Sequence, residues 1–319
     1  MSDAALQMRN ALQADASETS AASPCVSDFV ALLKPRVMSL VVFSGLAGLL
    51  IAPGQIHPLI AAVAIFCIAI GSGASGAINM WYERDIDALM ARTKSRPLPA
   101  GRMAPDTAIA FGITLAVAAV VLMGLIVNWT AGLLLALAEA FYIFVYTVWL
   151  KRRTPQNIVI GGAAGAFPPM IGWAAVTGDI AMLPMLLFAI IFMWTPPHFW
   201  ALALYRSDDY ARAGVPMLPV VAGLKATRRH ILLYSVFLAP LTLAPWALQL
   251  TGAVYGFSAA VLGAVFVACA IAVQFDETER APRRLFGFSI LYLFLLLTAI
   301  VADSLLGLAT APAAWSLHL

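Results

Sequence analysis

The feature of this chain that most constrains its fold is a succession of long apolar runs with very few charges. A membrane-spanning helix needs about 20 mostly apolar residues, and the sequence contains many such windows. The composition agrees, because 62% of the residues are hydrophobic and only 11% are charged. The runs are continuously apolar, whereas the strands of a membrane barrel would alternate in polarity. We therefore predict an all-α, polytopic membrane protein and exclude a soluble domain.

The apolar runs predict nine transmembrane helices in one bundle. The spans lie at about 37–53, 59–78, 107–126, 130–149, 157–176, 183–204, 231–249, 252–273 and 286–308. They belong to one predicted domain, residues 28–308. Residues 1–27 are polar and rich in Ala and Ser, and we expect a flexible cytoplasmic tail there. Residues 309–319 are expected to form a short tail on the non-cytoplasmic side.

All 19 Lys and Arg residues fall on one side of this nine-span arrangement. They precede the first span or follow the second, fourth, sixth and eighth spans. The positive-inside rule places that side in the cytoplasm, so we expect the amino terminus inside and the carboxyl terminus outside. The two longest predicted loops, 79–106 and 205–230, lie on the same side, and long loops in compact folds are often functional. We therefore expect the chemistry at the cytoplasmic face.

The first long loop begins with three oxygen-bearing side chains at helical spacing. If the second span continues as a helix, Asn79, Glu83 and Asp87 recur at every fourth residue and share one face. Such a set suits Mg²⁺, which keeps some waters and bridges to substrate phosphates. Arg92 and Arg96 follow among five basic residues suited to phosphate or carboxylate groups. The alternative is a solvated loop whose mixed charges only mark the membrane boundary.

The second long loop follows a proline pair in the sixth span. Pro196 and Pro197 remove backbone donors, so we expect a kink that aims His198 into a cavity. His198 is the only histidine inside a predicted span, and an intramembrane ionisable group suggests function, although a hydrogen-bonded structural histidine is the alternative. Asp208 and Asp209 would complete an acidic pair opposite the first cluster.

Three successive cations, Lys151, Arg152 and Arg153, end the fourth span. They could anchor the helix at the membrane edge or hold a diphosphate.

The glycine pattern Gly71-x-Gly73-x-x-Gly76 has the residue spacing of a dinucleotide-binding loop, but no β-strand precedes it as that motif requires. We interpret it as close helix packing within an apolar span.

These segments together resemble a known family. The matching motifs are Asn79-x-x-x-Glu83-x-x-x-Asp87, Arg92-Thr-Lys-Ser-Arg96-Pro, Tyr146-Thr-x-x-Leu-Lys151-Arg, Trp194-Thr-Pro-Pro-His198-Phe-Trp and Asp209-Tyr-Ala-Arg. Over residues 28–308 the chain resembles the UbiA-type intramembrane aromatic prenyltransferases. The last two motifs resemble the branch of that family that prenylates haem.

The resemblance implies a nine-helix bundle around a cavity open to the bilayer, in a bacterial inner membrane. The implied reaction joins the farnesyl group of farnesyl diphosphate to a vinyl group of haem b, adds a hydroxyl from water, and releases diphosphate and haem O. Haem b and farnesyl diphosphate are thus expected as substrates, Mg²⁺ as cofactor and the bilayer as surroundings. A homo-oligomer or a downstream haem-processing enzyme is a candidate partner, and nucleic acid is not expected.

The resemblance also assigns roles to residues. Those implied to hold Mg²⁺ and the diphosphate are Asn79, Glu83, Asp87 and Asp209. Those implied to bind the diphosphate or the haem propionates are Arg92, Arg96, Lys151 and Arg152, with Tyr146 and Tyr205 also lining the substrate site. His198 is implied to contact the haem. The chain departs from benzoate-prenylating members, which carry aspartates where it has His198 and Tyr205, and Glu83 replaces the commoner Asp.

Two other functions remain open from the sequence. A related prenyltransferase could act on a quinone precursor or another aromatic acceptor. An ion-coupled transporter could use the intramembrane acids Glu139 and Asp303 together with the loop acids as its pathway. Such a transporter would work without Mg²⁺ and without releasing diphosphate.

Overall fold

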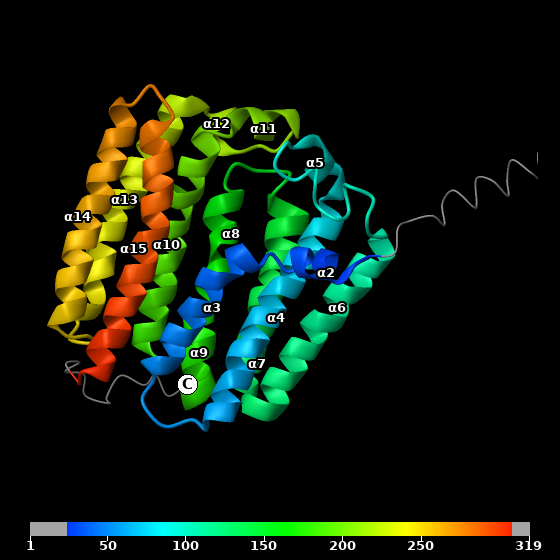
Figure 1. The fold of residues 1–319 in the computed structure, drawn as a ribbon. Helices are drawn as coiled ribbons and strands as arrows, with labels where there is room; N and C mark the ends of the chain where they lie inside the picture. The colour runs from blue at the N-terminus through cyan, green and yellow to red at the C-terminus, as the bar shows by residue number, and fades with distance from the viewer. Residues whose placement is uncertain (1–23, 308–319) are drawn as a thin grey trace, which may run out of the picture.

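A computed structural model describes residues 24–307, and this range is built from helices without a β-strand (Figure 1). The helices are α2 (Val26–Leu32), α3 (Pro35–Leu50), α4 (Pro58–Tyr82), α5 (Arg84–Leu89), α6 (Pro105–Leu122), η1 (Met123–Val127), α7 (Trp129–Ala140), η2 (Phe141–Leu150), α8 (Asn157–Ala166), α9 (Pro168–Thr177), α10 (Met182–Leu204), α11 (Ser207–Arg212), α12 (Leu218–Val221), α13 (Gly223–Ala247), α14 (Ala253–Phe275) and α15 (Arg280–Leu305). The predicted all-α fold is confirmed.

The described residues contain 8 helices long and apolar enough to cross a membrane. The described pair α2 and α3 passes the same test when taken together, with a bend of 54° at the short break between the two helices, and counting this pair as one span gives nine. This agrees with the nine predicted spans. The expected tails lie largely at 1–23 and 308–319, outside the described residues, although α2 already begins at Val26.

Two helices begin earlier than predicted. α13 starts at Gly223 rather than 231, and α15 starts at Arg280 rather than 286. Their first turns carry Lys, Arg and His side chains, which hydropathy places in a loop although the backbone there is already helical. The second loop is therefore shorter than the predicted 205–230, and it contains the short helices α11 and α12.

Glycine allows the closest helix contacts in the bundle. A Cβ added at Gly172 of α9 would lie 1.9 Å from the backbone oxygen of Gly45 on α3, so two backbones touch there. Small residues permit such approaches in membrane helices. The Gly71-x-Gly73-x-x-Gly76 pattern is confirmed as packing, because Gly73 faces Leu33 beside the α2–α3 bend.

The third and fourth spans each end in a π-helical segment. η1 continues α6, and the ten-residue η2 continues α7 to the end of the span. The wider turn persists to the last residue, since the amide of Lys151 donates to the carbonyl of Tyr146 at 3.0 Å. π-helical turns often occur at functional sites, and η2 ends at the motif Tyr146-Thr-x-x-Leu-Lys151.

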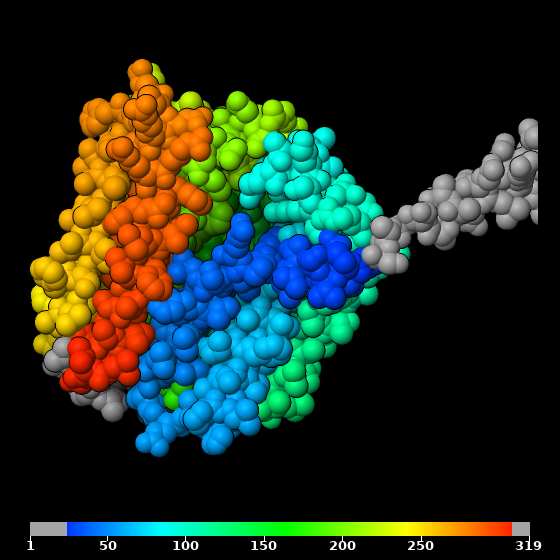
Figure 2. All heavy atoms as spheres, in the orientation of Figure 1, coloured from blue at the N-terminus to red at the C-terminus, as the bar shows by residue number. Residues whose placement is uncertain are grey.

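The short helices α5, α11 and α12 gather at one end of the bundle (Figure 1). One apolar cluster at this end combines residues of both loops, Ile86 and Met90 from the first and Tyr210, Val215 and Met217 from the second, with Ile158 and Ala203. The two long loops therefore meet, although they are far apart in sequence. Figure 2 shows the surface hollowed between α15, the segment that includes α5, and the α2–α3 bend.

Candidate active site

The centre of the candidate site is the junction of α4 and α5, where Asn79, Glu83 and Asp87 share one face. The amide of Glu83 donates to the carbonyl of Asn79 at 3.0 Å, and that of Asp87 donates to Glu83 at 2.8 Å. Helical hydrogen bonding thus continues through the boundary between the two helices. All three residues are buried, with 2%, 1% and 3% of their surface exposed in chain order.

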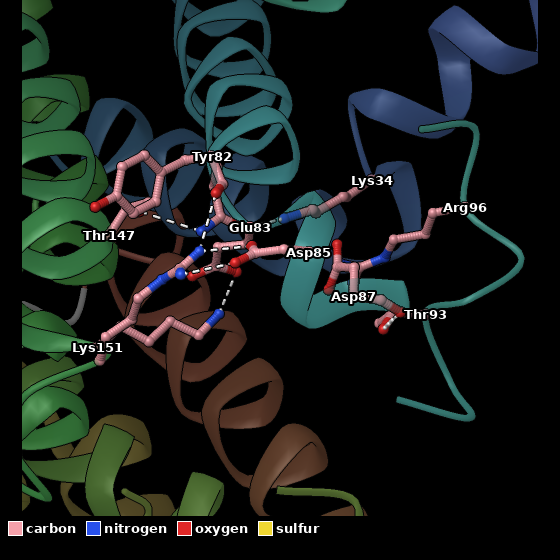
Figure 3. Close-up of polar contacts among 11 residues, drawn as sticks. Lys34, Tyr82, Glu83, Asp85, Asp87, Thr93, Arg96, Thr147 and Lys151 are labelled. Carbon is pink, nitrogen blue, oxygen red and sulfur yellow. Dashed lines mark hydrogen bonds and ion pairs between the residues drawn. The ribbon is translucent and has the colours of Figure 1, made fainter. Parts of the chain in front are cut away.

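The side-chain oxygen of each of these three residues contacts a basic side chain from a different segment (Figure 3). The pairs are Lys34 Nζ with Asn79 Oδ1 at 2.9 Å, Arg96 Nη1 with Asp87 Oδ2 at 2.6 Å, and Lys151 Nζ with Glu83 Oε2. Removing a lone carboxylate from water costs several kcal/mol, so the buried acids need such partners. Although burial lowers the pKa of Lys151, the charge and hydrogen bond of Glu83 outweigh it, and the pKa lies above its usual value.

One oxygen of the cluster is left without a partner. Glu83 Oε1 is buried and has no hydrogen bond to any described residue. A buried polar atom without a partner is costly, so this oxygen is available to a ligand. Among the described residues no three His, Cys, Asp or Glu side chains lie close enough to hold a metal ion by themselves. Two carboxylates and an amide fit Mg²⁺ only when water and substrate phosphate complete its ligands.

Lys34 is a site residue that the sequence analysis missed. It lies at the bend between α2 and α3 with a left-handed backbone, φ 52°, directly before Pro35. Non-glycine residues seldom adopt this conformation, and it is often found at functional sites. Lys34 was counted only among the 19 Lys and Arg residues of the sequence, because hydropathy does not reveal a backbone bend.

Two hydroxyl groups hold the acidic face in place. Asn79 Nδ2 donates to Thr147 Oγ1 of η2 at 3.2 Å, and Thr93 Oγ1 donates to the carbonyl of Asp87 at 2.8 Å. Tyr146, the neighbour of Thr147, lies beneath Lys151, with the ammonium 5.6 Å from the ring centroid. The π-helical segment therefore carries both a support for the amide and an aromatic surface for the lysine.

Arg152 and Arg92 lie at the outer side of this cluster. Arg152 forms a bidentate pair with Asp85 at 2.9 and 2.7 Å, and it stacks on Tyr82 with 5.1 Å to the ring centroid. The hydrogen bonds of Arg152 hold the pKa of Asp85 below its usual value. Arg92 is exposed on the loop after α5. The pair Arg152–Asp85 thus fastens the end of η2 to α5.

The second loop places its two aspartates differently. Asp209 is buried and pairs with Arg212 one turn later, whereas Asp208 is exposed and contacts the hydroxyl of Ser207. They do not form the expected acidic pair, because successive residues of α11 point in different directions. No hydrogen bond or ion pair in the described range joins Asp209 to the α4–α5 face, although Tyr210 of α11 and Ile86 of α5 lie in one apolar cluster.

His198 lies in an aromatic stack between α10 and α15. Its ring is parallel to those of Trp194 and Phe286, with centroids 4.4 and 4.6 Å away. Its Nδ1 lies 2.6 Å from the hydroxyl of Ser289. Pro196 and Pro197 do not interrupt α10, which runs unbroken from Met182 to Leu204.

Tyr205, just after α10, connects this stack to two exposed cations. Arg283 lies 4.5 Å and Arg206 5.8 Å from its ring centroid, and its ring meets Phe286 edge-on at 6.2 Å. Burial raises the pKa of Tyr205, and the nearby guanidinium groups of Arg283 and Arg206 oppose that shift. The result is an aromatic and cationic rim at the start of α15.

The intramembrane acids lie apart from these clusters. Asp303 Oδ2 accepts the backbone amide of Tyr255 at 3.0 Å and so caps the start of α14 from a neighbouring helix. Glu139 of α7 is buried against Gly71 of α4. Asp303 therefore has a structural role that explains its place in the membrane.

Comparisons with known proteins identify the family of the chain. The sequence model of the UbiA prenyltransferase family matches residues 41–298. A protoheme IX farnesyltransferase from Parvibaculum lavamentivorans is 61% identical over 285 residues, which cover 88% of this chain and 90% of that protein. One from Rhizorhabdus wittichii is 59% identical over 284 residues, covering 88% and 94%.

Solved structures share the fold at low identity. One solved structure comes from a study of digeranylgeranylglyceryl phosphate synthase in membranes. It has a TM-score of 0.73 and 19% sequence identity, and the match covers 88% of this chain and 98% of that one. A UbiA homologue from Archaeoglobus fulgidus bound to DMAPP and Mg²⁺ has a TM-score of 0.59 and 16% identity, covering 85% and 99%.

Proposed function

The chain belongs to the UbiA prenyltransferase family, and we propose that it transfers the farnesyl group of farnesyl diphosphate to a vinyl group of protoheme IX. A hydroxyl from water is added, and haem O and diphosphate are released. The names of the relatives at about 60% identity support this acceptor. One observation carries the proposal. The buried side chains of Asn79, Glu83 and Asp87 share one face at the end of the bundle, and each contacts a Lys or Arg side chain.

The reaction requires that the protein bind and stabilise the leaving diphosphate. Diphosphate leaves an allylic carbon only when its growing negative charge is neutralised, and fixed cations at that point lower the barrier. Lys34, Arg96 and Lys151 already converge on the acidic face (Figure 3). When a polyanion enters, these side chains can turn from the protein oxygens to the phosphate oxygens. Arg92 and Arg152 contribute further positive charge at the outer side.

We assign the magnesium site to Asn79, Glu83 and Asp87, and we assign Asp209 of α11 to the same site as a further ligand from the second loop. The free and buried Oε1 of Glu83 supports this assignment, because it is an oxygen donor without a partner. Bound Mg²⁺ would supply charge neutralisation at the leaving diphosphate. An archaeal homologue of the same fold was solved with DMAPP and Mg²⁺.

The acceptor belongs on the other side of the hollow in Figure 2, toward α10 and α15. His198 contacts the haem there, Tyr146 and Tyr205 line the substrate site, and the hollow admits apolar substrates from the bilayer. An allylic cation must be kept from bulk water, and a cavity at the membrane edge meets that need. We place this site at the cytoplasmic face of a bacterial inner membrane, because the predicted spans put every Lys and Arg of the sequence on that side.

The proposal is tested with purified protein in lipid nanodiscs. Labelled farnesyl diphosphate and Mg²⁺ are supplied with either haem b or 4-hydroxybenzoate, and products are identified by mass spectrometry. We expect label only on haem, with the mass of farnesyl plus a hydroxyl. Label only on the benzoate would reassign the acceptor, and absence of transfer with ion uptake into liposomes would favour a transporter.

A further inference from the structure

The histidine of the aromatic stack is held by a serine from another helix. Ser289 of α15 is fully buried, and its hydroxyl oxygen lies 2.6 Å from Nδ1 of His198 and 2.7 Å from the carbonyl of Phe286. The backbone of Ser289 is fixed as well, because Trp194 Nε1 donates to its carbonyl at 2.9 Å. Two hydrogen bonds therefore tie α10 to α15 at this residue.

The single proton of the serine hydroxyl determines the tautomer of the histidine. A carbonyl can only accept, so the hydroxyl of Ser289 donates its proton to Phe286. The same oxygen must then accept from His198, since two acceptors 2.6 Å apart would repel. Nδ1 of His198 therefore carries the proton, and Nε2 carries the lone pair. Among the described residues, none forms a hydrogen bond with Nε2.

The ring is also fixed in orientation. Trp194 and Phe286 lie on its two faces at interplanar angles of 17° and 22°, and Phe199 meets its edge at 83°. This packing prevents the ring from turning over, so Nε2 keeps one direction. Histidines that bind metals usually donate their other ring proton to a neighbouring acceptor, which fixes the tautomer in the same way.

We propose that Ser289 is a positioning residue that presents Nε2 of His198 to the haem iron of the acceptor. The inference rests on the proposed function, because it takes haem as the substrate. Ser289 does not touch the haem in this arrangement, and its effect passes through His198. The iron–nitrogen bond would hold the porphyrin beside α15, where Arg283 stacked on Tyr205 provides a cation for an acidic edge.

The test compares serine variants by haem spectroscopy in nanodiscs. Ser289→Ala removes the hydroxyl oxygen that accepts the hydrogen bond from His198. Ser289→Cys keeps a side chain of similar size with a weaker hydrogen-bond acceptor, and Ser289→Thr keeps the hydroxyl. The matched control is Ser235→Ala, which removes another buried helix serine bonded only to the carbonyl of Ile231. Optical and EPR spectra of ferric haem b report histidine ligation, and titrations report the affinities for haem and farnesyl diphosphate.

We expect Ser289→Ala to weaken haem binding about 10- to 100-fold and to lose the histidine-ligation signature, as for other groups that orient metal ligands. Ser289→Cys should fall between the alanine variant and the native protein, and Ser289→Thr should retain the signature. Farnesyl diphosphate affinity should not change in any of them, nor should either affinity in Ser235→Ala.

Two results would overturn the inference. In the first, the native protein farnesylates haem but its haem spectrum shows no histidine ligation. In the second, Ser289→Ala has the same haem spectrum and the same haem affinity as the native protein. Both leave the proposed function intact. If the native protein instead transfers farnesyl only to another acceptor, the proposed function itself fails.

Discussion

At the scale of single residues, the site consists of buried charges that depend on one another. Asp87 is 3% exposed and pairs with Arg96 at 2.6 Å. Removing one member of a buried pair leaves the other uncompensated, which is usually more costly than losing the pair. The same side chains therefore support the local structure and, in the proposed function, bind the magnesium diphosphate.

Asp87→Asn tests this dual role while keeping the shape of the side chain. We expect haem-dependent diphosphate release to fall at least about 100-fold, because the developing charge loses part of its fixed electrostatic environment. The variant should still insert and elute as a folded protein. The matched control is Asp106→Asn, at an exposed carboxylate in the first turn of α6. Near-native turnover in Asp87→Asn would remove Asp87 from the site.

Residue spacing predicted part of this site. Asn79, Glu83 and Asp87 could be placed on one face from their four-residue intervals, because the helical period is a local property. Lys34 and Ser289 could not be found this way. Each reaches its partner across tens of residues in sequence, and such contacts depend on how the helices pack.

At the scale of elements, hydropathy predicted the spans well but placed some of their ends wrongly. The starts of α13 and α15 were placed too late, since charged first turns extend the helix beyond the apolar run. The π-helical form of η2 was not predicted either. Its apolar run does not distinguish a π-helix from an α-helix by hydropathy, and the contact between Thr147 and Asn79 joins residues far apart in sequence.

The contact between α3 and α9 offers a test of packing. In Gly172→Ala the new methyl group would meet the backbone oxygen of Gly45, which cannot move without shifting the helix. Overpacking of this kind costs about 1–3 kcal/mol. We expect a lower thermal unfolding temperature in detergent than for Gly165→Ala, whose new methyl group meets no atom within 4 Å. Equal unfolding temperatures would show that these backbones do not touch.

At the scale of the whole molecule, the two long loops lie together beside the hollow of Figure 2. The distribution of cations predicted that both loops share a face, and the apolar cluster to which both contribute residues confirms that they lie at the same end of the bundle. Which side of the membrane they occupy remains a prediction from charge, because the fold alone has no direction relative to the cell.

Cysteine labelling tests that orientation. In a Cys25→Ser background, Gln55→Cys lies in the exposed loop between α3 and α4, and Lys94→Cys in the exposed loop after α5. We expect a membrane-impermeant maleimide to label Gln55→Cys in intact spheroplasts and Lys94→Cys only after the membrane is opened. The reverse pattern would put the site on the outer face.

The most direct test of the central claim is an experimental structure with Mg²⁺ and a non-hydrolysable thio analogue of farnesyl diphosphate. We predict the metal within bonding distance of Glu83 and Asp87, the diphosphate in contact with Lys34, Arg96 and Lys151, and the prenyl chain directed into the hollow. A diphosphate bound elsewhere, with the three cations still paired to Asn79, Asp87 and Glu83, would contradict the claim.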